Sequence, residues 1–290
     1  MSRSVGIMAL TAQHDERLTK HQHGGGRVAG FVEVDLGADL ETAEVLPISD
    51  VHVGDPAFRE EAFSNLLKWV LEARNRFVLL GGDLANVATR SSVSDVYASR
   101  MSPAEEIAYI TKKLRPLADE KRLLVSVEGN HEHRITKQDG IDPAEVIANN
   151  LGVPYHREGA VLFIRLGKAV RSSGRHDGEK LGYLVYLTHG SAGGRKPGSK
   201  ANMLESMSLN MEGVDAIVVG HTHQVLAMRN EVCIPDIHNK RMLTRDRVYV
   251  NAGSFLGWGG YAESAAFTPG SSVMPVLILD GSRKNIQVRL

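Results

Sequence analysis

The sequence predicts an α/β fold with two packed β-sheets. From Val28 onward, short apolar runs alternate with segments whose apolar residues recur every three to four positions, the pattern of strands interleaved with helices. Most segments after residue 160 are again strand-like, which provides strands for a second sheet. Because no internal repeat and no strong linker follows residue 30, we expect one domain over residues 28–290 and a mobile N-terminal extension over residues 1–27.

The first half of the chain alternates expected strands with expected helices. The strands are apolar runs at residues 31–34, 45–48, 77–80 and 123–127. The helices carry apolar residues at helical spacing over residues 57–74, 102–118 and 142–152. Ser102-Pro103 begins the second helix with a capping residue and a proline at the first helical position.

The second half is expected to be richer in strands. These follow apolar runs at residues 161–166, 181–187, 214–219, 248–251, 276–279 and 286–290. Between them, residues 199–211 are expected to form a helix whose apolar side chains share one face: Met203, Leu204, Met207 and Met211. A methionine stripe at that spacing predicts core packing rather than a cofactor site.

Composition excludes several classes of protein. Apolar residues make up 42% of the 290-residue chain, too many for a wholly disordered protein. The 34 basic and 34 acidic side chains cancel, which argues against binding nucleic acid through overall charge. No apolar run approaches the roughly 18 residues of a membrane span, and residues 5–10 are short for a secretory signal. With Cys233 as its single cysteine, the chain is expected in a reducing compartment, the cytoplasm.

Polar side chains follow the ends of five expected strands. Each apolar run ends in glycine or another small residue and then in Asp, Asn or His: Asp50 and His52, Asp83, Asn130 and His131, His189, and His221 with His223. Ligands of open α/β sheets bind at the carboxyl ends of strands, so we expect these side chains to converge. Each alone could be a turn residue, a helix cap or a structural histidine. Together they form a set of metal ligands.

The chemistry of this set favours two metal ions. Seven donors are too many for one tetrahedral centre but suit a pair of ions that share a carboxylate. Imidazole nitrogens mixed with carboxylate and amide oxygens favour Mn, Fe or Zn over Ca or Mg. Two ions about 3.5–4 Å apart can lower the pKa of a shared water and clamp a phosphoryl group.

The same residues resemble the calcineurin-like metallophosphoesterase superfamily. Its blocks are matched in order, between about Val45 and Phe255, by Asp50-Val51-His52, Gly82-Asp83, Gly129-Asn130-His131-Glu132, Thr188-His189-Gly190 and Gly220-His221-Thr222-His223. The resemblance implies a four-layer α/β/β/α sandwich with two mixed sheets. It also implies a dimetal phosphoesterase, in which we expect two divalent ions, Mn in the first place, with Fe or Zn as alternatives.

The resemblance further implies a role for each residue. Asp50, His52 and His223 would hold the first ion, and Asp83 would bridge to the second. Asn130, His189 and His221 would complete the second site, and a bridging hydroxide would attack phosphorus in line. His131 would stabilise the transition state and protonate the leaving oxygen, a task suited to a near-neutral pKa. Alternatively, it would only orient Asn130.

Two positions bear on the branch of the superfamily. Arg134 stands where Ser/Thr protein phosphatases carry an arginine that grips substrate phosphate. Those enzymes continue the Gly-Asp block with a second aspartate and an arginine, whereas Asp83 is followed here by Leu84, Ala85 and Asn86. Arg134 and Asn86 are therefore expected to meet substrate, but protein phosphatase activity is in doubt.

Basic residues after His189 suggest a second phosphate contact. Arg195 and Lys196 lie in a glycine-rich loop that either binds a second phosphate or is simply solvated. Trp258 and Tyr261 could stack on a base or anchor a loop. We therefore expect a phosphodiesterase acting on DNA, RNA or a nucleotide, without a membrane partner, in the cytoplasm of a bacterium or phage-infected cell. The alternatives are a phosphomonoesterase and a non-catalytic scaffold.

The N-terminal histidines, including His14 and His21, are either a solvated tail or an adventitious metal-binding tract. The segment Val250-Asn251-Ala252-Gly253-Ser254 resembles the Asn-x-Gly-Ser block that follows the metal ligands in the superfamily and lies behind the metals. For this block we expect a structural role that supports His221 and His223.

Overall fold

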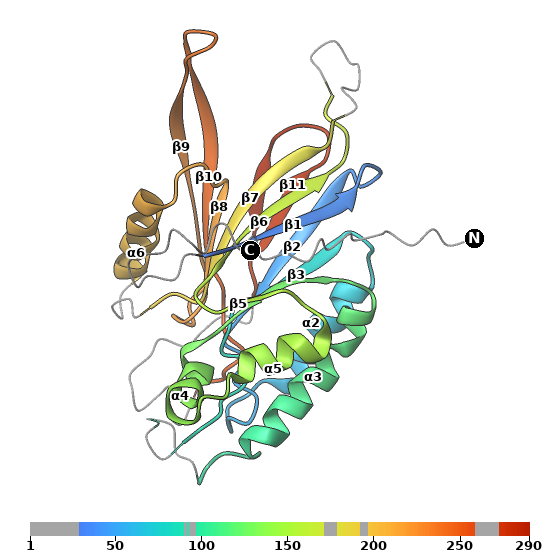
Figure 1. Cartoon of the computed structure of the whole chain (residues 1–290), viewed down its shortest axis with the longest axis vertical. Coiled ribbons are helices and arrows are strands. Elements are labelled where there is room, and N and C mark those ends of the chain that lie inside the picture. Colours follow the sequence, from blue (N-terminus) through green and yellow to red (C-terminus); the bar gives the residue numbers. More distant parts are fainter. Residues whose placement is uncertain (1–28, 90–91, 93–96, 171–178, 192–196, 259–272) are drawn as a thin grey trace, which may run out of the picture.

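The computed structural model describes residues 29–89, 92, 97–170, 179–191, 197–258 and 273–290. Its framework is a pair of mixed six-stranded sheets (Figure 1). Sheet A has, in spatial order, β1 (Gly30–Gly37), β6 (Ala160–Leu166), β7 (Leu181–Thr188), β8 (Ala216–Val219), β10 (Arg241–Asn251) and β9 (Leu226–Asp236). Sheet B has β12 (Ile286–Arg289), β11 (Val276–Asp280), β2 (Thr42–Ile48), β3 (Arg76–Leu80), β4 (Leu123–Val127) and β5 (Tyr155–His156). The expected N-terminal extension lies outside the described residues.

Helices cover the outer faces of both sheets. The described helices are α2 (Glu60–Leu71), α3 (Pro103–Asp119), α4 (Asn130–Asp139), α5 (Pro143–Leu151) and α6 (Pro197–Asn210). In Figure 1, α2, α3 and α5 lie below sheet B, and α6 lies on the far side of sheet A. None of the described helices has the length and apolar content to cross a membrane.

Three apolar cores lie between these layers and hold them together. Side chains of both sheets, including Val45, Ile164 and Val185, form the core between the sheets. A second core joins sheet B to α2, α3 and α5, and a third joins sheet A to α6. The layers therefore run α/β/β/α, which confirms the predicted sandwich.

The methionine face of α6 packs on sheet A as the sequence predicted. Leu204 is fully buried, and Met203, Met207 and Met211 pack around it against β8 and β10. The stripe is core packing.

Two of the described helices begin at a residue whose side chain caps them. Ser102 caps α3 with a capping box to Glu105, and Asp142 caps α5 by accepting a hydrogen bond from the Glu145 N–H. Helix α2 is shorter than predicted, because the backbone before it bonds elsewhere. There the Arg59 N–H bonds the Phe255 carbonyl instead of continuing the helix.

Besides the two-residue strand β5, the sequence analysis missed two longer elements. Helix α4 has Glu132 as its only buried residue, so it shows little apolar periodicity. Strand β9 pairs with β10 along its whole length, but most of its side chains are partly or fully exposed. Neither element carries the burial pattern on which sequence prediction depends.

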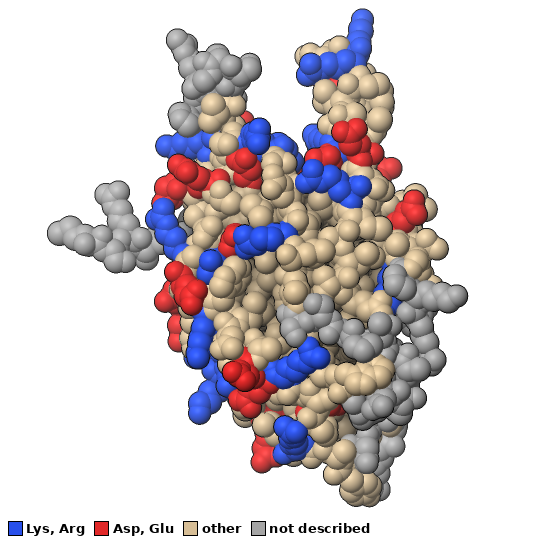
Figure 2. Space-filling view, turned by 180° about the vertical axis from the view of Figure 1, so that it is seen from behind, with Lys and Arg blue, Asp and Glu red and all other residues tan. Residues whose placement is uncertain are grey.

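Surface charge agrees with the zero net charge. On the face shown in Figure 2, the described acidic and basic side chains are interspersed.

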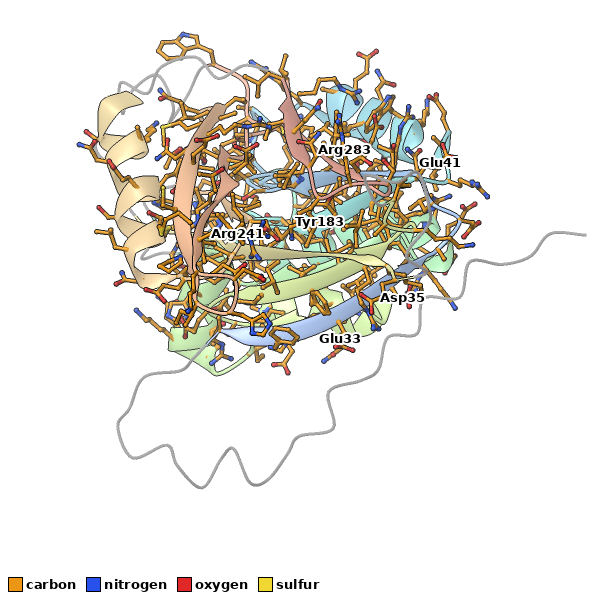
Figure 3. All side chains as sticks on the ribbon, turned by 90° about the horizontal axis from the view of Figure 1, so that it is seen from above. Glu33, Asp35, Glu41, Tyr183, Arg241 and Arg283 are labelled. Atoms are coloured by element: carbon orange, nitrogen blue, oxygen red, sulfur yellow. The ribbon has the colours of Figure 1, made fainter. Side chains whose placement is uncertain are left out.

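Figure 3 looks down on the end of the sandwich opposite the carboxyl ends of β7 and β8, with Tyr183 near its centre. The Tyr183 hydroxyl lies 2.7 Å from the Asp280 carbonyl oxygen and accepts a hydrogen bond from the Asn285 N–H at 2.9 Å. These bonds join β7 of sheet A to the β11–β12 turn of sheet B.

Candidate metal centre

The polar residues predicted from the strand ends do converge. Asp50 follows β2, Asp83 follows β3, and Asn130 opens α4 directly after β4. From sheet A, His189 follows β7, and His221 and His223 follow β8. The carboxyl ends of strands from both sheets thus meet at one edge of the sandwich.

A first group of donors consists of Asp50, His52 and His223. His223 Nε2 lies 3.1 Å from Asp50 Oδ1 and 3.2 Å from His52 Nε2. His52 Nε2 lies 3.8 Å from the same Asp50 oxygen. Two imidazole nitrogens and a carboxylate oxygen therefore face one another closely enough to share one ion.

A second group consists of Asp83, Asn130, His189 and His221. His189 Nε2 lies 3.2 Å from Asp83 Oδ2 and 3.0 Å from Asn130 Oδ1. The same amide oxygen lies 2.6 Å from His221 Nδ1. This arrangement again places imidazole, carboxylate and amide donors around a common point.

Asp83 connects the two groups. Its Oδ2 lies 3.2 Å from His189 Nε2 and 3.8 Å from His52 Nε2. Donor atoms within 4.8 Å of one another also unite Asp83 with His52 and His131. The carboxylate thus lies where a ligand shared by two ions would lie.

The donor set fits divalent metal ions. Asp50 Oδ1 is buried and, among the described residues, makes no hydrogen bond of acceptable geometry despite its closeness to His223. Buried charged oxygens without a hydrogen bond are costly unless a cation compensates them. The site contains nitrogen and oxygen donors but no thiolate, a set typical of Mn, Fe or Zn centres.

Burial and neighbouring charges perturb the pKa values of these ligands. Burial alone would raise the pKa of Asp83, but the imidazoles of His189 and His131 bring it well below its usual range. Burial would lower the pKa of His189, yet the Asp83 carboxylate raises it to about 10. The pKa of His221 is lowered by its burial and by the charge of His189. The charges of the Asp83 carboxylate and the His189 imidazole therefore stabilise each other, whereas His221 disfavours its charged form.

Most of the donor residues have a strained backbone. Asp50, His52, Asp83, His221 and His223 have φ values of 54°, 50°, 50°, 65° and 57°. Residues other than glycine rarely adopt positive φ, at a cost of about 1–3 kcal/mol each. Two of these loops each contain a pair of such donors, Asp50 with His52 and His221 with His223.

Glu132 holds the loop that carries Asp83. It is buried on α4, and its carboxylate oxygens accept backbone hydrogen bonds from Asp83 at 3.0 Å, Leu84 at 2.7 Å and Ala85 at 3.1 Å. The sequence analysis included Glu132 in a motif but gave it no role. Its place directly after His131 was the available signal.

Neighbouring side chains orient the other donors. Ser49 Oγ donates to Asp50 Oδ2 at 2.6 Å, and the His221 N–H donates to the same oxygen at 2.8 Å. Nδ1 of His189 lies 2.8 Å from the Gly81 carbonyl oxygen, which directs Nε2 toward Asp83. Such contacts fix both the rotamer and the tautomer of a metal-binding histidine.

The trailing asparagine block lies behind the centre, as expected. Asn251 Nδ2 donates a hydrogen bond to Thr222 Oγ1, between His221 and His223. Ser254 Oγ donates to the Asp50 carbonyl oxygen at 3.0 Å.

Gly129 shows how tightly the loops pack. A Cβ atom at this position would come within 2.1 Å of both the backbone nitrogen and Oδ1 of Asp83. Only glycine fits there, immediately before Asn130.

His131 reaches the centre from the first turn of α4. Its N–H donates to Asp83 Oδ1 at 2.8 Å, and its Nδ1 lies 3.0 Å from the Asn86 carbonyl oxygen. Burial, with a further effect of His52, lowers the pKa of His131 to about 3. The expected near-neutral pKa was therefore wrong for the substrate-free site, because desolvation disfavours the imidazolium.

The predicted substrate-binding residues have different positions. Arg134 lies one turn beyond Asn130 on α4, with its Nε 3.4 Å from the Asn130 carbonyl oxygen. The side chain of Asn86 is only 2% exposed, and the residue meets His131 through its backbone carbonyl. Arg195 and Lys196 lie outside the described residues. Of the aromatic candidates, Trp258 is 47% exposed, and Tyr261 also lies outside the described part of the chain.

A protein-family model supports this site. The calcineurin-like phosphoesterase family model matches residues 44–225, well over half of the chain, and this range includes every donor described above. No curated protein matches the chain.

Solved structures give distant likenesses. The calcineurin-like phosphoesterase YfkN of Bacillus subtilis is 12% identical, with a TM-score of 0.38 over 86% of this chain and 88% of that one. A predicted phosphoesterase of Streptococcus pneumoniae is 13% identical, with a TM-score of 0.38 over 86% and 90%. A metallophosphoesterase of Sphaerobacter thermophilus is 14% identical, with a TM-score of 0.37 over 82% and 83%. On the strength of the family match and the clustered divalent-metal donors, the chain belongs to the calcineurin-like phosphoesterase family and is a metal-dependent phosphoester hydrolase.

Proposed function

We propose that this chain hydrolyses a phosphodiester of a nucleic acid or nucleotide at a pair of divalent metal ions. The observation that carries the proposal is the meeting of two donor groups at Asp83, whose Oδ2 lies near both His52 and His189. A paired site suits in-line displacement at phosphorus, in which attacking and leaving oxygens both need charge stabilisation.

Each ion would have its own ligands. Asp50, His52 and His223 would hold the first, and Asn130, His189 and His221 the second, with Asp83 shared. Mn is the metal we expect, with Fe or Zn as alternatives, because the donors mix imidazole with carboxylate and amide oxygen. When bound, the ions supply Lewis acidity and lower the pKa of a water.

His131 would assist the reaction from beside the ions. With Nδ1 held by the Asn86 carbonyl, the ring presents Nε2 4.0 Å from Asp83 Oδ2. An incoming phosphate would raise the pKa of this histidine, because negative charge favours the imidazolium. Nε2 would then stabilise a phosphoryl oxygen and deliver a proton to the leaving oxygen.

The amino terminus of α4 would help to bind the phosphate. Asn130 begins this helix, and Gly129 before it offers no side-chain cap. Because the His131 N–H already donates to Asp83 Oδ1, this terminus would favour the anion through the helix dipole rather than through that N–H.

Replacement of His131 by Ala tests its role. Turnover should fall by about 100-fold or more, while the bound metal measured by atomic emission stays unchanged. Equal losses of metal and of rate would instead assign His131 to holding Asn130.

A phosphomonoesterase is the second candidate, favoured by Arg134 on α4 near Asn130. A guanidinium can bind a terminal phosphate bidentately. Within this candidate, protein Ser/Thr phosphatase activity has less support, because the buried Asn86 provides no carboxylate for His131.

The test is turnover of metal-stripped protein with Mn, Zn, Fe or Mg restored singly. Bis(p-nitrophenyl) phosphate reports diester cleavage, and p-nitrophenyl phosphate reports monoester cleavage. Metal-dependent preference for the diester supports the proposal and justifies a screen of DNA, RNA and nucleotides. Preference for the monoester would replace it with the second candidate. Two bound ions without turnover of either ester would favour a non-catalytic scaffold.

A further inference from the structure

A cavity of about 310 Å³ adjoins the second donor group. It is lined by Asn130 and His189 of that group and also by His133, Arg157 and Met207. Its volume is near the lower limit of small-molecule sites. A substituent on a phosphorus atom held by Asn130 and His189 would therefore extend into this cavity.

His133 is held in place by a buried carboxylate. Its Nδ1 lies 2.6 Å from Glu128 Oε2, and Glu128 Oε1 accepts a hydrogen bond from Thr136 Oγ1 at 2.6 Å. Glu128 is only 7% exposed, and it anchors a His133 ring whose side chain is 37% exposed and can meet a ligand. Because Glu128 occupies Nδ1, Nε2 is the ring nitrogen left for a hydrogen bond with a ligand hydroxyl.

The positive charge of Arg157 is already compensated. Its Nε and Nη2 lie 3.1 and 2.9 Å from Asp142 Oδ2, and Nε lies 3.7 Å from Glu128 Oε2. Glu158 adds another carboxylate to the lining. A second phosphate placed here would meet carboxylates without an uncompensated cation among the described lining residues, which makes its binding unfavourable.

The remaining lining suits a neutral polar group. Ser191 contributes a hydroxyl, and Met207 contributes an apolar thioether. Acceptors, a hydroxyl and an apolar surface together match a sugar, which offers O–H donors on a carbon framework.

We infer that this cavity binds a neutral, hydroxyl-bearing substituent of sugar size on the substrate phosphorus, and that His133 recognises one of its hydroxyls. The inference rests on the proposed phosphodiesterase function. It narrows the substrate to a sugar or nucleoside ester without a second phosphate in this cavity.

Three p-nitrophenyl esters with one leaving group test the inference. The second substituent on phosphorus is phenyl, 5′-thymidyl or 3′-phospho-5′-thymidyl, and kcat/KM is measured for each with the metal-loaded protein. We expect the thymidyl ester to be cleaved at least tenfold faster than the phenyl ester, and the 3′-phosphorylated ester to lose that advantage. His133→Ala should reduce the thymidyl advantage by about tenfold, the effect of one hydrogen bond, and leave the phenyl ester within twofold.

Controls separate recognition from folding. His133→Gln keeps a side-chain donor for Glu128 and should retain the melting temperature while losing part of the thymidyl preference. His238→Ala, in the β9–β10 turn, should change nothing.

The outcomes distinguish failure of the sugar-binding inference from failure of the proposed phosphodiesterase function. Cleavage of the phenyl and thymidyl esters at equal rates, or equal loss of both in the His133 variants, would overturn the inference but leave the phosphodiesterase standing. Faster cleavage of the 3′-phosphorylated ester would overturn it as well. Failure to cleave any diester with any metal would overturn the proposed function, and the inference with it.

Discussion

The two ends of the sandwich differ in backbone strain and in how well their polar groups are hydrogen-bonded. At the carboxyl ends of β2, β3 and β8, donor residues with positive φ crowd charges together, and Asp50 Oδ1 lacks a hydrogen bond among the described residues. At the other end, seen in Figure 3, Tyr183 places its hydroxyl among the Asp280 carbonyl and the Asn285 N–H with good geometry. The first end holds strain and charge whose cost metal binding would offset, whereas the second joins the two sheets through satisfied hydrogen bonds.

We therefore expect the donor end to determine function and the Tyr183 end to contribute to stability. Substitutions at the donor end should affect metal binding and turnover most. Substitutions around Tyr183 should affect unfolding and leave catalysis unchanged. The predictions below test that division.

The largest effect is expected from Asp83→Asn. The change keeps the size of the side chain but removes the charge that both donor groups share. Turnover should fall at least about 100-fold, because loss of a ligand exceeds the 10–100-fold effect of an outer partner. Turnover of bis(p-nitrophenyl) phosphate measures the loss. Asp119→Asn, at the exposed end of α3, is the matched control and should retain full activity.

Glu132→Gln should have the next largest effect. An amide replaces the carboxylate that accepts three backbone hydrogen bonds from the Asp83 loop, so Asp83 loses its fixed position. Metal affinity should fall about 10- to 100-fold in a chelator competition. Glu145→Gln on α5 serves as control, and unchanged affinity of the Glu132 variant would assign that residue to folding alone.

Glu106→Gln should alter how stability depends on pH. Glu106 is buried on α3, and its Oε2 accepts the N–H of Val87, a β-branched residue at φ 36°, at 2.6 Å. Burial raises the pKa of Glu106 to about 7, and the charge of Asp55 adds to this. The folded protein therefore holds a proton that the unfolded chain has already released, and its contribution to stability is lost as pH rises from about 4.5 to 7.

Urea unfolding between pH 5 and 8 measures this effect. The wild type should lose up to about 3 kcal/mol more than the Gln variant over that range. Parallel profiles for the two proteins would show that Glu106 does not titrate there.

Tyr183→Phe should have the smallest effect, confined to stability. Removal of the hydroxyl leaves the Asn285 N–H without this acceptor and should cost about 1–2 kcal/mol of unfolding free energy. Urea titration measures the loss, and kcat should stay within twofold. A substantial fall in kcat would contradict the division between the two ends.

The sequence predicted the elements of the sandwich wherever a buried face gave a regular apolar pattern or a capping residue marked a helix start. Ser102 marked the start of α3, and the apolar run at residues 45–48 marked β2. Helix α4 and strand β9 left little record, because α4 buries only Glu132 and β9 is largely exposed. The turn at Gly140, which ends α4 with φ 71°, was a signal that went unused.

The donors were predictable from their order along the chain. The backbone conformations, hydrogen bonds and burial that position them were not. The positive φ values at Asp50 and His221 were not predictable, because neither residue is a glycine that would mark such a conformation in the sequence. Glu132 bonds backbone 47 to 49 residues earlier in the chain, a contact that only the fold creates. The pKa of His131 likewise depends on burial, which its neighbours in the sequence do not determine.

The most direct test of the binuclear centre is anomalous diffraction from crystals of the full chain grown with Mn. The account predicts two peaks about 3.5–4 Å apart, on either side of the Asp83 carboxylate. The first should lie among Asp50, His52 and His223, and the second among Asn130, His189 and His221. A single peak, or two peaks that do not share Asp83, would contradict it.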